Sequence, residues 1–238
     1  MNDKYYSKIV DKILDIKLKT FGATHIVGQK WCGKTTTANQ KAKSSLKLQS
    51  IPNKKSIIMT AKITPSVLLE GDKPRLIDEW QGAPKLWDAV RLYCDDHKEK
   101  GLFILTESTS KIVITSHTGT GRISKLKMYP MSLYESKESN GSVSLMKLFD
   151  GEEDLSLGCC TNLSYDELIF ASCRGGWPLG ILLDDDDTKL YVAKDYFNQI
   201  CEAGLNSLDN VKRNPTTMRA ILRSYARNIS TLAKKLIF

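Results

Sequence analysis

Residues Gly28 to Thr35, GQKWCGKT, place two glycines, a lysine and a threonine at the spacing G-x-x-x-x-G-K-[ST]. Glycines at both ends let the backbone curl so that successive N–H groups point inward and form a cradle for a polyphosphate. The lysine supplies a mobile charge for the outer phosphates, and the threonine hydroxyl can bind Mg²⁺. The spacing therefore predicts nucleotide binding by Gly28, Gln29, Lys30, Trp31, Cys32, Gly33, Lys34, Thr35 and Thr36.

A phosphate cradle needs a second metal ligand, and the stretch RLIDEW offers two adjacent acids. Asp78 is expected to hold Mg²⁺ together with Thr35, and Glu79 to orient or deprotonate the attacking water. Two neighbouring acids alone are a weak indication of a metal site, because acidic residues often begin a helix. The phosphate-binding loop elsewhere in the sequence strengthens this indication. Thr106 or Ser108, at the end of LFILTES, is expected beside the γ-phosphate as a sensor; a solvated strand end is the open alternative.

The elements around these residues alternate between strand and helix patterns. We expect strands at 24–27, 56–60, 75–80, 102–106 and 123–133, and helices before Phe21, from Gly33 to about Leu48, around 65–69 and from Pro84 to about Lys98. This alternation is typical of a parallel sheet flanked by helices. The fold class expected is an α/β P-loop NTPase.

The last third of the sequence carries helix signals without strand signals. Its expected helices are 165–174 with a capping box at Ser164 and Glu167, 189–203, and 215–228 with Asn214 as cap and Pro215 in the first position. The acidic run at 184–187 is expected to be a solvated linker. We therefore expect a P-loop nucleotide-binding core with an N-terminal helix at 1–150 and a mostly helical region at 151–238.

The composition indicates the cellular compartment of the protein more clearly than it indicates a binding partner. The 238 residues are 41% hydrophobic, which is enough for one sizeable core, and the N-terminus lacks the unbroken apolar run of a signal peptide. Six cysteines without a CxxC pair, and no stretch of membrane-spanning length, favour a cytoplasmic protein with no membrane partner. The net charge of +8 is compatible with nucleic acid, an acidic membrane or an acidic partner, and selects none of them.

Several longer stretches are similar to bacterial and archaeal AAA-type P-loop ATPases that carry a second domain of unknown function after the ATPase core. They are GQKWCGKTTTA, LLEGDKPRLIDEWQGAPKLWDAVR, GLFILTES, HTGTGRISKLKMYPMSLYES, SVSLMKLF, CRGGWP and SYARNIST. The resemblance implies an AAA+-like core to about Phe149, followed by a lid or winged-helix-like helical region. It also implies a nucleotide site on the loop and on Asp78 and Glu79. ATP rather than GTP rests on the resemblance, because the sequence shows no base-reading motif.

The sequence departs from the family pattern in three places. Gln29 stands where proline is usual, which looks harmless, and Glu107 stands where glycine is usual, close to the expected γ-phosphate. Glu107 should therefore either weaken hydrolysis or turn outward. Similar proteins continue beyond SYARNIST, so a downstream domain is expected to be missing.

Two sets of arginines have alternative interpretations. Arg122, between glycine-rich sequence and an expected strand, could reach the γ-phosphate of a neighbouring subunit in a homo-oligomer, although a structural arginine is the favoured alternative. Arg219, Arg223 and Arg227 form one cationic stripe on the last expected helix. That stripe could contact nucleic acid, or it could face water or an absent domain.

The function expected is Mg²⁺-dependent ATP hydrolysis that switches the conformation of the protein. The first alternative is a nucleotide-dependent scaffold with little turnover, which Glu107 favours. The second is a small-molecule kinase, which an acid placed to activate water and the lack of an arginine-rich lid argue against.

Overall fold

A computed structural model of the chain describes residues 5–49, 54–108, 118–152, 158, 160–204, 214–229 and 231. At its centre lies a five-stranded sheet with the strand order β2-β3-β4-β1-β5, in which every neighbouring pair is parallel. The strands are β1 (Ala23–Gly28), β2 (Ser44–Lys47), β3 (Arg75–Asp78), β4 (Phe103–Ser108) and β5 (Ile123–Met128). The predicted fold class is therefore confirmed.

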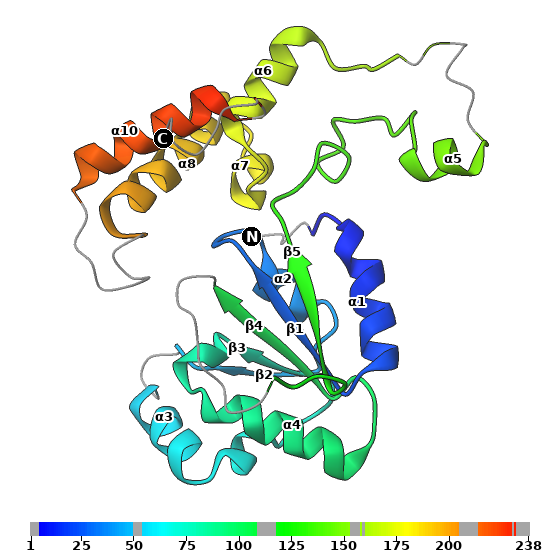
Figure 1. Ribbon diagram of the computed structural model, residues 1–238, viewed down its shortest axis with the longest axis vertical. Coiled ribbons are helices and arrows are strands. Elements are labelled where there is room, and N and C mark those ends of the chain that lie inside the picture. The colour runs from blue at the N-terminus through cyan, green and yellow to red at the C-terminus, as the bar shows by residue number, and fades with distance from the viewer. Residues whose placement is uncertain are drawn as a thin grey trace.

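Helices cover both faces of the sheet (Figure 1). On one face pack α1 (Ile9–Thr20) and α2 (Lys34–Asn39); on the other pack α3 (Lys54–Ile63), the 3₁₀ turns η1 (Pro65–Leu69) and η2 (Trp80–Gly82), and α4 (Lys85–His97). Successive side chains of a strand point to opposite faces, so Ile104 joins the α1 side whereas Leu105 joins the α4 side. By the same alternation, Thr106 and Ser108 share one face at the end of β4 and Glu107 belongs to the other.

The remaining helices lie beyond the carboxyl ends of the strands (Figure 1). They are α5 (Leu145–Asp150), α6 (Tyr165–Arg174), α7 (Pro178–Leu182), α8 (Asp186–Gln199), the π-helical turn η4 (Ile200–Gly204) and α10 (Pro215–Asn228). The predicted capping signals are confirmed: Ser164 and Glu167 bond reciprocally at the start of α6, and the Asn214 side chain accepts from the Thr216 N–H. These caps satisfy backbone N–H groups that have no partner within the helix.

Two predicted elements are wrong. The helix after the loop ends at Asn39, and residues 44–47 form the edge strand β2. Three consecutive threonines are poor helix formers, and the burial of Leu46 and Leu48 follows the two-residue period of a strand. Residues 56–60 lie in α3, where Ile57 and Ala61, four positions apart, both pack on the core.

The acidic run at 184–187 is also more structured than the linker that we expected. The Asp185 side chain accepts from the Thr188 N–H, 2.9 Å away, and so caps α8. Asp186 and Asp187 fall in the first turn, where the helix dipole stabilises negative charge.

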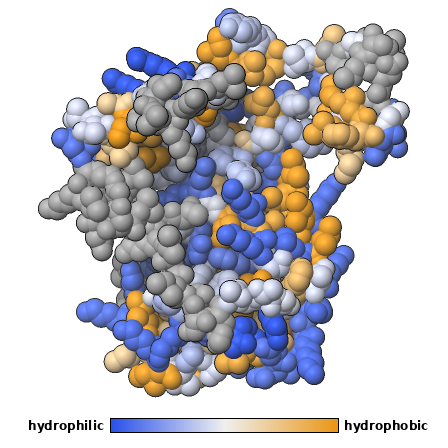
Figure 2. Space-filling model, in the orientation of Figure 1, coloured by the Kyte–Doolittle hydropathy of each residue, from blue (hydrophilic) through white to orange (hydrophobic). Residues whose placement is uncertain are grey.

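The described surface includes apolar side chains outside the core. Figure 2 shows them over α1 and over α5, on the right of the view, where the exposed members are Ile9, Ile13, Ile16, Leu145, Met146 and Phe149. Within the described part of the chain, each helix is too short or too polar to cross a membrane.

Candidate nucleotide site

The loop from Gly28 to Thr35 joins the end of β1 to the start of α2, the context that its sequence predicts. A Cβ atom on Gly28 would lie 2.3 Å from the carbonyl oxygen of Met128 on β5, so only glycine fits there. Gly33 has φ +93°, a left-handed conformation that glycine adopts without strain, at the N-cap of α2. Both glycines are therefore required by the path of the loop.

Lys34 is folded back across this loop. Its side chain is buried, and the ammonium donates to the carbonyl oxygens of Gly28 at 3.0 Å and Gln29 at 2.7 Å. The positive charge thus lies inside the curve of the loop.

The predicted acids lie at the same edge of the sheet as the loop. The Thr35 hydroxyl donates to Asp78 Oδ1 at 2.7 Å, and the Thr106 hydroxyl donates to the same oxygen at 2.6 Å. Asp78 and Thr106 are register partners on β3 and β4. The structure therefore brings together three predicted residues from three separate segments.

Glu79 follows in a left-handed conformation, with φ 58° and ψ 48°. Its backbone N–H donates to Thr106 Oγ1 at 3.3 Å, and its carboxylate accepts from the Ser108 hydroxyl at 2.6 Å and from the Gln81 amide. Glu79 and Ser108 thus lie together beside Asp78.

A pocket of about 600 Å³ opens between the loop and the helices beyond the sheet. Its polar wall is made by the loop, the start of α2, Glu79 and Ser108, and its apolar wall by Pro178, Leu179 and Leu182 of α7. Sequence reasoning placed no residue of α7 in the site. The only available signal was the stretch CRGGWP, which we had noted for family resemblance alone.

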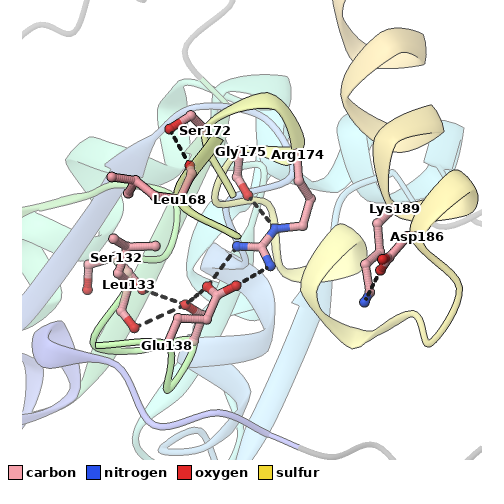
Figure 3. A network of polar contacts seen from close by, with 10 residues as sticks. Ser132, Leu133, Glu138, Leu168, Ser172, Arg174, Gly175, Asp186 and Lys189 are labelled. Carbon is pink, nitrogen blue, oxygen red and sulfur yellow. Dashed lines mark hydrogen bonds and ion pairs between the residues drawn. The ribbon is translucent and has the colours of Figure 1, made fainter. Parts of the chain in front are cut away.

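An ion pair between Arg174 and Glu138 lies next to the turn that leads into α7 (Figure 3). Arg174, at the end of α6, donates to the two carboxylate oxygens of Glu138 at 2.8 and 2.9 Å and to the Gly175 carbonyl at 3.1 Å. The neighbouring Met131 N–H donates to the Gly176 carbonyl at 2.6 Å. The segment after β5 therefore holds the turn that leads into α7.

Aromatic rings make a second connection. Trp31, in the loop and 44% exposed, lies with its ring 5.6 Å from that of Tyr196 on α8, and Tyr196 lies 4.4 Å from Trp177. Trp31 is therefore partly exposed and in contact with the helices beyond the sheet.

The segment before α1 closes the other side of the loop. Lys8 is buried and its ammonium donates to the Cys32 carbonyl at 2.7 Å, while the Tyr5 hydroxyl donates to Asp11 at 2.7 Å. Burial lowers the pKa of Lys8 and raises that of the Cys32 thiol. A cavity of about 90 Å³ lies here, lined by Tyr5, Tyr6, Lys8, Gly33, Thr36, Met131, Pro178 and Leu182.

Glu107 points away from this pocket. Its carboxylate lies on the α4 side of the sheet, where Oε2 is 3.4 Å from His25 Nε2. Of the two outcomes expected for Glu107, the structure shows the side chain turned away from the phosphate loop. Its carboxylate therefore gives no reason to expect weak hydrolysis.

Arg122 lies at the opposite end of the sheet from the loop. It directly precedes β5, whereas Met128, the register partner of Gly28, ends this strand. At about 3.3 Å per residue the separation is roughly 20 Å. Arg122 Nε donates to Asp95 at 2.6 Å, so a role in phosphate chemistry would require the site of a neighbouring subunit.

The three arginines of the cationic stripe on α10 differ in their contacts and exposure. Arg219 donates to Asn198 at 2.7 Å and lies 3.5 Å from a carboxylate oxygen of Glu202. Arg223 and Arg227 are exposed. The stripe therefore offers two exposed cations to solvent rather than three.

Comparison with known proteins places this geometry in a family. The family model described as an AAA domain matches residues 20–137. No curated protein matches the sequence. A solved structure, the Walker-type ATPase PABY2304 of Pyrococcus abyssi, is 12% identical, with 96% of this chain and 77% of that chain covered and a TM-score of 0.47. The matched residues 20–137 include the loop, Asp78, Glu79, Thr106 and Ser108, so the part of the chain that carries the site is similar to an AAA domain.

Proposed function

We propose that the chain binds Mg²⁺-ATP between the Gly28–Thr35 loop and α7 and hydrolyses it. The observation that carries this proposal is the 2.7 Å contact between the Thr35 hydroxyl and Asp78. It joins a hydroxyl at the start of α2 to a carboxylate at the end of β3, beside a buried lysine and a pocket with one polar and one apolar wall.

The side chains at this contact suit magnesium. Mg²⁺ prefers oxygen ligands and is usually held by one or two carboxylates together with phosphates and water. Thr35 and Asp78 would hold it, and no larger cluster of His, Cys, Asp or Glu ligands occurs among the described residues. When bound, the ion would neutralise charge that develops on the phosphates.

The roles of the other residues follow from their positions. Lys34 would exchange its two carbonyl partners for phosphate oxygens, because an ammonium ion bonds a charged oxygen more strongly than a neutral one. Glu79 would orient or deprotonate the attacking water, and Ser108, bonded to that carboxylate, would report on the γ-phosphate. Thr106 would hold Asp78 in place.

The apolar wall of the pocket would receive the nucleoside. Pro178, Leu179 and Leu182 present carbon-rich side chains opposite the phosphate loop, and a purine base buries its faces against such surfaces. Because α7 belongs to the helices beyond the sheet, nucleotide would join those helices to the core. Hydrolysis is then coupled to their position, with 1–150 as the core and 151–238 as the moving region.

Phosphate release in the steady state tests this proposal. Wild-type protein should release phosphate from ATP only with Mg²⁺, and Glu79→Gln should lower kcat by about 10² to 10⁴ while ATP still binds. Glu99→Gln is the matched control, because it makes the same change at an exposed site two residues after the end of α4. If ADP forms only with an added small-molecule acceptor and no free phosphate appears, the protein is a kinase instead; full turnover by Glu79→Gln would show that another group activates water.

A further inference from the structure

A buried histidine lies beneath the proposed site, on the α4 side of the sheet. His25, in the middle of β1, is 6% exposed, and its Nε2 atom accepts a hydrogen bond from the indole Nε1–H of Trp80 at 3.0 Å. Trp80 is 3% exposed and directly follows Glu79. The His25 ring also meets Trp80 and Trp87 edge-on, with centroids 5.6 and 5.2 Å away. One imidazole nitrogen therefore anchors the residue next to Glu79.

The backbone of Glu79 needs such an anchor. Its φ of 58° is unfavourable for a residue with a Cβ atom, and such a conformation persists where neighbouring contacts hold it. On one side, the Glu79 N–H donates to Thr106. On the other side, the Trp80 indole is held by His25. The second contact fixes the direction in which the chain leaves Glu79, and with it the position of the carboxylate.

His25 has a second neighbour that competes for the same nitrogen. Glu107 Oε2 lies 3.4 Å from Nε2. A neutral ring with its proton on Nδ1 accepts from Trp80, whereas a protonated ring would donate to Glu107 and leave the Trp80 N–H without this acceptor. The nitrogen can therefore serve Trp80 or Glu107, but not both.

Other charged groups lie on the elements around the ring. They are Lys125 and Lys127 on β5, on the same face by register, and Asp88 and Arg91 on α4. Both lysines are exposed, and Arg91 pairs with Asp95. Glu107 is the charged group for which the structure shows a contact with the ring.

We propose that His25 is a positioning residue for Glu79, acting through Trp80 as a hydrogen-bond acceptor at Nε2. This inference rests on the proposed hydrolysis at Glu79. Without this acceptor the Trp80 indole is free, and Glu79 can leave its left-handed conformation. ATP binding persists, because Lys34 and Thr35 do not depend on this contact.

Three variants test the chain of contacts. His25→Phe keeps a ring and removes the acceptor, His25→Gln keeps an acceptor oxygen, and Trp80→Phe removes the donor. His25→Phe and Trp80→Phe should each lower kcat by about 10- to 100-fold, since small misplacements of a catalytic group cost this much. KM should change little, because the lost interaction acts in the transition state. The double variant should be no worse than either single one, and His25→Gln should restore most of the turnover.

A nucleotide-free measurement separates positioning from general damage. Protein with ¹⁵N-labelled tryptophan gives four indole N–H signals, one for each tryptophan, and Trp80→Phe identifies the Trp80 signal. That signal should move in His25→Phe and change little in His25→Gln.

The outcomes distinguish this inference from the proposed function. If wild type hydrolyses ATP and Glu79→Gln does not, but His25→Phe keeps the wild-type kcat, the inference is overturned and the proposed function stands. An indole signal that does not respond to His25→Phe overturns it as well, whatever the turnover. If the wild type itself releases no phosphate, both fall together.

Discussion

Replacement of Glu138 by Gln should loosen α6 and α7 from the core of the protein. Arg174 is 5% exposed and donates two hydrogen bonds to the Glu138 carboxylate, whose side chain is 25% exposed. A glutamine has nearly the same volume but only one acceptor oxygen and no charge. One guanidinium N–H group would therefore face an amide N–H₂ group in place of a carboxylate oxygen.

The expected size of the effect follows from these contacts. A hydrogen bond to a charged group contributes about 1.5 to 3 kcal/mol, so Glu138→Gln should lower the free energy of unfolding by about 2 kcal/mol. For a protein of this size, that corresponds to a Tm lower by about 4 to 8 °C. ATP affinity should also fall, because α7 forms the apolar wall of the pocket.

The effect should depend on pH in a defined direction. The hydrogen bonds from Arg174 outweigh burial and lower the pKa of Glu138 below its ordinary value of 4.5. A carboxyl group with a lowered pKa in the folded state stabilises that state above the ordinary value, and this contribution is lost as the pH falls through the folded value. The stability difference between wild type and Glu138→Gln should therefore be full at pH 7 and shrink below about pH 4.5.

Thermal unfolding followed by circular dichroism at pH 7 and at pH 4 measures both quantities. Glu152→Gln, the same change at an exposed position, is the control and should leave Tm unchanged. A Glu138→Gln protein as stable as this control at pH 7 would refute the role assigned to the ion pair. A difference that is equal at both pH values would refute its electrostatic origin.

Three further predictions concern Trp31, Arg122 and the arginines of α10. Trp31 fluorescence should change when Mg²⁺-ATP is added, since the loop orders around nucleotide beside Tyr196; an unchanged signal, with Trp31→Phe as the reference, would count against this contact. If Arg122 acts on a neighbouring subunit, specific activity should rise with protein concentration and Arg122→Ala should lower turnover with little loss of ATP affinity, whereas full activity in a proven monomer would exclude this. Replacing Arg223 and Arg227 with Gln should flatten the salt dependence of log affinity for duplex DNA by about 1.8, at about 0.9 for each phosphate contact; absence of binding by wild type at low salt would exclude nucleic acid as a partner of this helix.

The polar half of the candidate site could be predicted because its signals are local. The loop from Gly28 to Thr35 carries its own spacing. Asp78 ends β3 and Thr106 lies two residues before the end of β4, and the apolar sequences of both strands are easy to identify. The carboxyl ends of parallel strands meet at one edge of a sheet, so these residues had to lie close together. Thr35 and Thr106 both donate to Asp78 Oδ1, at 2.7 and 2.6 Å.

The apolar half could not be predicted, because it depends on contacts between distant segments. Pro178 lines the pocket beside the loop, and the ion pair between Arg174 and Glu138 helps to hold the turn before α7. A local sequence pattern does not indicate such an ion pair. The orientation of Glu107 is a different case. Alternation along β4 predicts that Glu107 faces away from Thr106, and this signal was present in the sequence.

The most direct test that the loop and α7 enclose an ATP site is isothermal titration calorimetry. It compares the binding of Mg²⁺-ATP to wild type, Lys34→Ala and Lys55→Ala. Lys55 is exposed on α3, remote from the pocket lining, and is the matched control. Wild type and Lys55→Ala should bind one ATP with equal affinity, and Lys34→Ala should bind at least about tenfold more weakly, since a hydrogen bond to a charged group is worth about 1.5 kcal/mol or more. No binding by wild type, or equal binding by Lys34→Ala, would contradict the assignment of this pocket.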